Sequence, residues 1–140
     1  MIAESVATAV ITVIIGVAVY ALSQIVSKFV IEPIHKQDEI RGEISHSLAF
    51  YANVYGNPGS STSKHSEATD KFREQACLLA SKTRLIRKYG FFSAIGLVPC
   101  AQNVQKACGN LIGLSNCINK TGSSTQNVQW AEEIRKLLRI

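Results

Sequence analysis

The chain has 140 residues, 46% of them hydrophobic, and a formal net charge of +5. An apolar N-terminal run leaves about 110 residues, enough for one small domain with a hydrophobic core and too few for two. The positive charge is unevenly placed, because residues 75–131 contain six basic side chains and no acidic one. The net charge therefore describes a mildly acidic part followed by a basic part.

One uncharged run dominates the N-terminal part of the sequence. No charged side chain occurs between Glu4 and Lys28, and residues 6–22 read VATAVITVIIGVAVYAL. About 20 apolar residues span the hydrocarbon core of a bilayer, whereas strands usually run about 4–8 residues. The sequence therefore predicts a transmembrane anchor helix in residues 1–33, followed by an α-helical domain in residues 34–140.

Small and polar side chains gather on one face of this predicted helix. At about 100° per residue they fall within roughly one third of the circumference. In lipid, such a face lets a second helix approach closely and allows hydrogen bonds across the contact. The alternative is that each hydroxyl bonds a carbonyl of its own helix. The residues of the predicted transmembrane interface are Thr8, Thr12, Gly16, Tyr20, Ser23 and Ser27.

Charges flanking the anchor predict its orientation. Glu4 precedes the run, whereas Lys28, Lys36 and Arg41 follow it. Lys and Arg prefer the cytoplasmic side of a membrane, so we expect the N-terminus outside and the domain in the cytoplasm, at the inner (plasma) membrane. We expect no cleaved signal peptide, since no basic segment precedes the run and the run is too long.

Pro33 predicts a kink or an end of the anchor helix. If it only kinks the helix, the anchor and the next helix are continuous. Beyond the proline, apolar residues recur three or four positions apart and predict an amphipathic helix, which ends before a loop at residues 56–66, GNPGSSTSKHS. The expected inward face of this helix is Ile40, Ile44, Leu48, Tyr51 and Tyr55.

A third helix, capped by Ser66 or Thr69, is expected to stop at Gly90. Its expected inward face is Phe72, Ala76, Leu79, Thr83 and Ile86. The apolar run FFSAIGLV, residues 91–98, is too short to cross a bilayer and predicts either a buried helical turn or a segment that dips into the membrane interface.

Pro99 is expected to be the first residue of a fourth helix. The expected inward face of that helix is Val104, Cys108, Leu111 or Ile112, Ser115 and Ile118. After a second loop at residues 119–127, a short last helix is expected to face inward with Val128, Ala131, Ile134 and Leu138. No segment alternates with the period of a strand, so the predicted fold class is all-α, with about four helices after the anchor.

The four cysteines, Cys77, Cys100, Cys108 and Cys117, form no C-x-x-C pair and lie among apolar or small neighbours. We therefore expect buried free thiols in a reducing compartment. A zinc site is not expected, because all three histidines precede every cysteine.

The pair Glu43 and His46 has the i, i+3 spacing of a metal-binding helix, but no second E-x-x-H pattern accompanies it. A solvated helix face is the preferred interpretation. The chain also lacks the nucleophile elbow, zinc-protease and phosphate-loop motifs. We therefore expect no catalytic residue, no metal, no cofactor and no enzymatic activity.

A basic stretch close to aromatic side chains is the most suggestive feature of the predicted domain. Its cations are Lys82, Arg84, Arg87 and Lys88, followed by YGFF. They fit a solvated helix end or a contact with the acidic second helix of another molecule. They also fit binding to anionic lipid, at about 1 kcal/mol per cation. Nucleic acid, which basic clusters bind through phosphates, is the least favoured partner because an anchored domain already lies beside lipid.

The segment FVIEPIHKQDEIRGEISHSLAFYANVY, residues 29–55, resembles a part of small bacterial single-pass membrane proteins of unassigned function, in which an N-terminal helix leads into E-P-I and then a G-E-I-x-x-x-L-x-F-Y-A-N pattern. The resemblance implies an inner-membrane protein and brings no activity or binding residue. Three functions then remain open: an interaction or assembly protein that binds itself or a membrane partner, an oligomeric pore-forming effector, and an accessory subunit of a larger complex.

Overall fold

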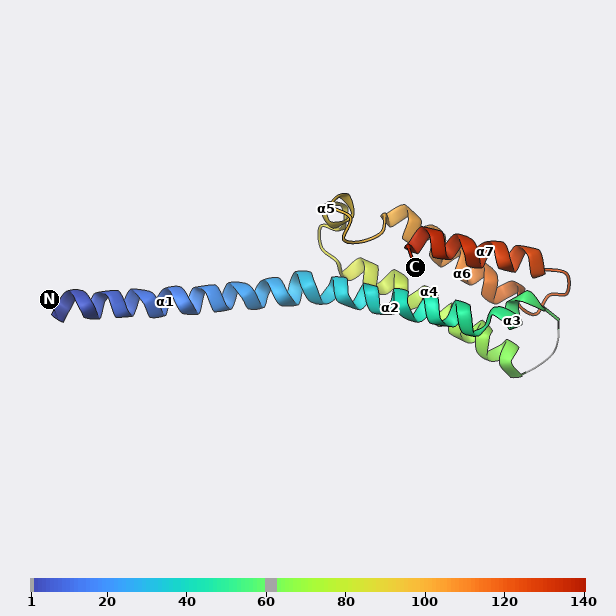
Figure 1. Ribbon diagram of the computed structural model, residues 1–140, viewed down its shortest axis with the longest axis horizontal. Helices are drawn as coiled ribbons and strands as arrows, with labels where there is room; N and C mark the ends of the chain where they lie inside the picture. The colour runs from blue at the N-terminus through green and yellow to red at the C-terminus, as the bar shows by residue number, and fades with distance from the viewer. Residues whose placement is uncertain (1, 60–62) are drawn as a thin grey trace.

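The computed structural model describes residues 2–59 and 63–140, and in them it contains helices, turns and short loops but no strand. The all-α prediction is therefore confirmed. A long helical rod, residues 2–50, leads into a bundle of antiparallel helices (Figure 1). The elements are α1 Ile2–Val26, the π-helical turn η1 Ser27–Ile31, α2 Glu32–Phe50, α3 Ala52–Gly56, α4 Ser63–Leu85, α5 Tyr89–Ala94, α6 Ala101–Cys117 and α7 Ser124–Leu138.

The rod runs through Pro33 without a break. Proline lacks an N–H, and its ring crowds the carbonyl four residues earlier in a regular α-helix. Here the turn before it is widened, because the N–H of Glu32 bonds the carbonyl of Ser27, five residues back. Such π-turns absorb a local mismatch within a continuous helix. Of the two outcomes predicted for Pro33, a kinked but continuous helix or a helix end, the structure shows a continuous helix. Within the described chain, Val6–Phe50 is the one helix that is long and apolar enough to cross a membrane.

The core lies among α2, α4, α6 and α7, with α4 packed between α2 and α6, and α7 packed on α6 and α3. The predicted inward stripe from Ile40 to Tyr55 is confirmed, since all five of its side chains are buried. The single helix predicted to carry it is divided, because α2 ends at Phe50 and Tyr55 lies on α3. Phe72, Leu79 and Ile134 are also fully enclosed. Helices α2, α4, α6 and α7 thus each bury one face, as their period of three to four residues requires.

Several predicted helix ends are wrong. Helix α7 begins at Ser124, inside the loop predicted for residues 119–127. Helix α4 begins at Ser63, one turn before Ser66, because the intervening Lys64 and His65 tolerate a helix. It ends at Leu85 rather than Gly90, since Lys88 adopts a left-handed conformation with φ of 57° and separates α5 from α4. Helix α6 begins at Ala101 with Cys100 as its extended N-cap, so Pro99 precedes the helix.

Two inward positions also need correction. Val128 is 38% exposed, and its neighbour Asn127 is buried in its place. The amide Nδ2 of Asn127 donates to the carbonyl of Tyr55 at 3.1 Å, which offsets the cost of burying a polar group. Of the pair left open in α6, Leu111 is buried and Ile112 is 43% exposed. Thr83 and Cys108 are only half-buried.

The neighbours Leu111 and Ile112 provide a matched test of this packing. Leu111→Ala should lower the free energy of unfolding by about 2–5 kcal/mol, because it opens a cavity in the core. Ile112→Ala should cost less than about 1 kcal/mol, since its side chain already meets solvent. Urea unfolding followed by the fluorescence of Trp130, which is half-buried and contacts Gly113 of α6, measures both. Equal effects of the two substitutions would contradict the observed register of α6.

Candidate functional site

Helix α1 extends away from the bundle along its whole length (Figure 1). No side chain from Val6 to Phe29 is buried, and Val13 and Tyr20 are each 65% exposed. This apolar surface is far larger than the patches that soluble monomers expose. It therefore requires a covering that the bundle does not supply.

The residues of the predicted transmembrane interface are all exposed, five on α1 and Ser27 at the start of η1. A Cβ atom built on Gly16 would meet no atom within 4 Å. Glycine inside a helix costs about 1 kcal/mol relative to alanine. Nothing inside the described chain requires a glycine here, so Gly16 leaves room for an approach from outside the chain.

The hydroxyls of this face bond their own helix, as the alternative interpretation expected. Thr12 donates its Oγ1 hydrogen to the carbonyl of Thr8 at 2.9 Å, and Ser23 donates to the carbonyl of Tyr20 at 2.7 Å. These bonds use the hydroxyl protons but leave acceptor lone pairs. A helix packed on this face would gain mainly from the small size of the side chains rather than from donated hydrogen bonds.

The predicted basic cluster lies where α4 ends, at the end of the bundle nearest α1 (Figure 1). Lys82 is half-buried, whereas Arg84, Arg87 and Lys88 are exposed. Cζ of Arg87 lies 5.6 Å from the centroid of the Phe29 ring, a cation–π contact with the π-turn of the rod. This contact joins the end of α4 to the C-terminal end of the apolar run.

Three acidic residues of α2 have cationic partners within the described chain. Glu32 pairs with Lys36, Asp38 pairs with Arg41, and Glu43 lies 3.9 Å from Lys71. No ion pair in the described residues involves the four cations of the basic cluster. Their charge is therefore left for a partner outside this chain or for solvent.

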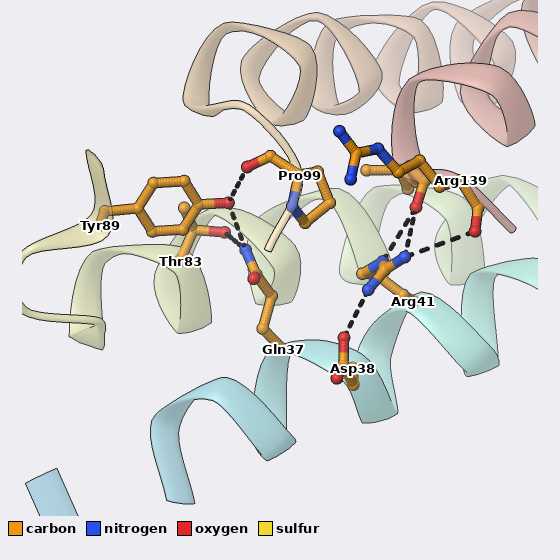
Figure 2. Close-up of polar contacts among 8 residues, drawn as sticks. Gln37, Asp38, Arg41, Thr83, Tyr89, Pro99 and Arg139 are labelled. Carbon is orange, nitrogen blue, oxygen red and sulfur yellow. Dashed lines mark hydrogen bonds and ion pairs between the residues drawn. The ribbon is translucent and has the colours of Figure 1, made fainter. Parts of the chain in front are cut away.

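Gln37 of α2 bonds α4 directly and is linked through Tyr89 of α5 to the segment before α6 (Figure 2). It is fully buried, and its Nε2 donates to Oγ1 of Thr83 at 2.8 Å and to Oη of Tyr89 at 3.0 Å. Tyr89 in turn donates to the carbonyl of Pro99 at 2.8 Å. Both amide hydrogens and the phenol hydrogen are thereby satisfied, so the network fixes where α5 begins.

Burial raises the pKa of Tyr89, which keeps its hydroxyl protonated as a donor. Because the folded-state pKa is raised, its contribution to stability is present below the ordinary tyrosine pKa of about 10 and is lost as the pH rises through the folded value.

Arg41 joins the rod to the end of α7 (Figure 2). Its Nε and Nη2 donate to the carbonyl of Leu138 at 3.0 and 2.6 Å, and Nη2 lies 3.4 Å from the carbonyl of Arg139. A guanidinium at a helix C-terminus satisfies carbonyls that lack helical partners and complements the helix dipole. From the sequence, Arg41 is predicted only as a charge that flanks the anchor, because its partner carbonyls lie 97 and 98 positions away.

The expected burial of the thiols is wrong for Cys77 and Cys100, which are exposed, while Cys108 and Cys117 are half-buried. Cys77 has apolar neighbours along the chain, but the helix turns it away from the face of Ala76. All four are free in the described structure. Burial, and secondarily Cys77, raises the pKa of Cys108 to about 11.

Glu43 and His46, which have the spacing of metal ligands along the chain, each contact a different side chain. The ring of His46 stacks on Phe50 at 5.8 Å, and Glu43 faces Lys71. Among residues 2–59 and 63–140, no three His, Cys, Asp or Glu side chains come together as a metal site would need.

Tyr89→Phe should loosen the α5 region, because it leaves the Pro99 carbonyl and one hydrogen of Gln37 without a partner. The expected cost in stability is about 1–3 kcal/mol. Hydrogen exchange of the amides of residues 91–97 should accelerate. Tyr51→Phe is the matched control, since its hydroxyl bonds Glu67 elsewhere in the bundle, and it should leave exchange in residues 91–97 unchanged. Unchanged exchange in both variants would refute the role given to Tyr89.

No family model, curated protein or solved structure matches this chain. The function of the site is therefore inferred from the described residues and their contacts.

Proposed function

We propose that this protein is a non-enzymatic, single-pass membrane protein that assembles through the small-residue face of α1, with copies of itself or with another membrane protein. The observation that carries the proposal is the exposure of every side chain of the apolar run from Val6 to Ile25. The bundle is fully formed without α1, so the helix is free to serve as an anchor and a contact surface.

Lipid accounts for the apolar part of α1, and the small-residue face supports a helix partner. Hydrocarbon supplies no hydrophobic force between helices, so association depends on close packing. Gly16, with open space where its Cβ would lie, is the position at which two backbones approach most closely. The proposed bilayer is the inner (plasma) membrane, with the N-terminus outside and the bundle in the cytoplasm, because Lys28 and Lys36 follow the run.

Gly16→Leu should weaken this association much more than Val17→Leu. Leucine is bulky at a helix contact and harmless toward lipid, and both positions are exposed in the single chain. We expect the association constant, and with it the crosslinked fraction at low protein density, to fall about fivefold for Gly16→Leu, as a packing loss of about 1 kcal/mol implies. An amine-reactive crosslinker in native membranes can use Lys28, which is exposed next to Ser27.

The crosslinked species also separates the alternative functions. A ladder of this chain supports self-association, and a single foreign band supports an accessory subunit. A ladder that is accompanied by ion leakage across the membrane would favour the pore-forming effector if Thr12→Val abolishes the leakage. No crosslinked species in the wild type, or equal effects of the two leucine substitutions, would refute assembly through this face.

The exposed thiols test the orientation. A membrane-impermeant maleimide should leave intact cells unlabelled and should label Cys77 and Cys100 after permeabilisation. Cys108 should react slowly, because a pKa of about 11 rather than 9.0 leaves roughly 100-fold less thiolate. Variants in which Cys77 and Cys100 are replaced by residues without a thiol provide the control. Labelling without permeabilisation would reverse the proposed topology.

A further inference from the structure

The chain between α4 and α6 forms an apolar loop with a closed neck. We use apolar loop for residues 91–97, which lie between Tyr89 and Pro99. The neck is closed by the hydrogen bond from Tyr89 to the Pro99 carbonyl, and Val98 and Pro99 are buried. The loop is therefore held firmly at its base while its outer residues project from the bundle.

The outer side of the apolar loop is uncovered. Phe91 is 61% exposed, Ile95 is 55% exposed and Leu97 is 54% exposed. Leu85, at the end of α4, is 55% exposed as well. Four large apolar side chains at one end of a small bundle form a patch of the kind that marks an interaction site.

Several backbone N–H groups of the apolar loop are paired within the loop. The N–H groups of Ile95 and Leu97 bond the carbonyls of Phe91 and Phe92 at 3.2 and 3.0 Å, and the N–H of Gly96 bonds Ser93 at 3.1 Å. Backbone groups that enter an apolar medium need such internal partners. The loop can thus enter an apolar environment with these donors paired.

The position of the loop along the rod matches the surface of a bilayer crossed by α1. The apolar run from Val6 to Ile25 is about 30 Å long at 1.5 Å per residue, which equals the thickness of the hydrocarbon core. The π-turn that follows then lies at the headgroups. Arg87 contacts Phe29 of this turn, and α5 lies at the end of the bundle nearest α1 (Figure 1).

The charged side chains on the chain segment that leads into the loop are all basic. Lys82, Arg84, Arg87 and Lys88 precede it, and residues 75–131 contain no acid. The exposed cations have no ion pair in the described chain. Cations next to exposed apolar side chains complement a leaflet that carries negative headgroups.

We propose that the apolar loop is a second membrane contact, which docks on the anionic leaflet of the bilayer that α1 crosses. Phe91, Ile95 and Leu97 enter the boundary between headgroups and acyl chains, and the four cations bind lipid phosphates. This proposal rests on the proposed anchoring by α1. It adds a contact that holds the bundle against the bilayer and makes its orientation depend on lipid charge.

The test uses the full chain reconstituted in vesicles whose lipids are brominated both near the headgroup end and near the middle of the bilayer, so that either depth is reported. Three single substitutions each add one tryptophan: Phe91→Trp in the loop, Val17→Trp in α1, and Thr125→Trp at the exposed far end of α7. The native Trp130 is present in all three variants, so its fluorescence contributes equally to each. In vesicles with phosphatidylglycerol, Phe91→Trp and Val17→Trp should be quenched, and Thr125→Trp should not.

Charge dependence is tested with Arg84→Gln and Lys88→Asn in the Phe91→Trp background. Asparagine suits the left-handed conformation of residue 88. The docking constant should fall about fivefold for each cation removed. The control combines Lys64→Gln with Lys120→Gln, which changes the net charge equally at exposed positions at the far end of the bundle. This control should leave the docking constant unchanged.

Each outcome decides between the proposals. If Val17→Trp is quenched and Phe91→Trp matches Thr125→Trp, the loop does not dock and the anchor remains supported. If Val17→Trp is not quenched, both anchoring and docking are refuted. If Phe91→Trp is quenched equally in purely zwitterionic vesicles, and neutralising its cations changes nothing, the proposed binding of anionic headgroups is refuted.

Discussion

The π-turn at residues 27–31 is the constraint on which the rest of the structure depends. Pro33 would end or sharply kink an α-helix, and the rod continues because the turn before it widens by one residue. The helix is continuous from α1 through the π-turn into α2, so the direction of one constrains the direction of the other. The bundle is therefore built on the same element that carries the apolar run, and its end near α1 has a defined distance from that run.

Polar contacts as well as apolar packing organise that end of the bundle. Gln37 and Arg41 lie one turn apart on α2, and they reach α4, the segment before α6 and the end of α7 (Figure 2). Buried hydrogen bonds of this kind contribute little net free energy each but are costly to break. They hold the ends of three segments against the rod. The apolar loop is thus presented at a constant place beside the π-turn.

The two proposed contacts act at different depths and depend on different physics. The face of α1 around Gly16 would pack inside hydrocarbon, where association depends on shape and is insensitive to salt. The cations around the apolar loop would act at the headgroups, where attraction depends on lipid charge and is screened by ions. Because the rod is continuous, tilting α1 in a helix assembly would also tilt the bundle, and would bring the loop toward or away from the leaflet.

The sequence by itself determined the helical class, the apolar run and most inward faces, because hydrophobic periodicity records which side of a helix meets other residues. Ile40, Ile44 and Leu48 were predictable for that reason. Tertiary structure decided what periodicity does not record: Gln37 bonds Thr83 and Tyr89, which lie 46 and 52 positions away, and Asn127 replaces Val128 in the core because the Tyr55 carbonyl accepts its hydrogen bond. The same holds for Pro33, whose effect on the rod depended on whether the neighbouring turn widened, and for Cys77, whose exposure depends on which face of α4 the bundle covers.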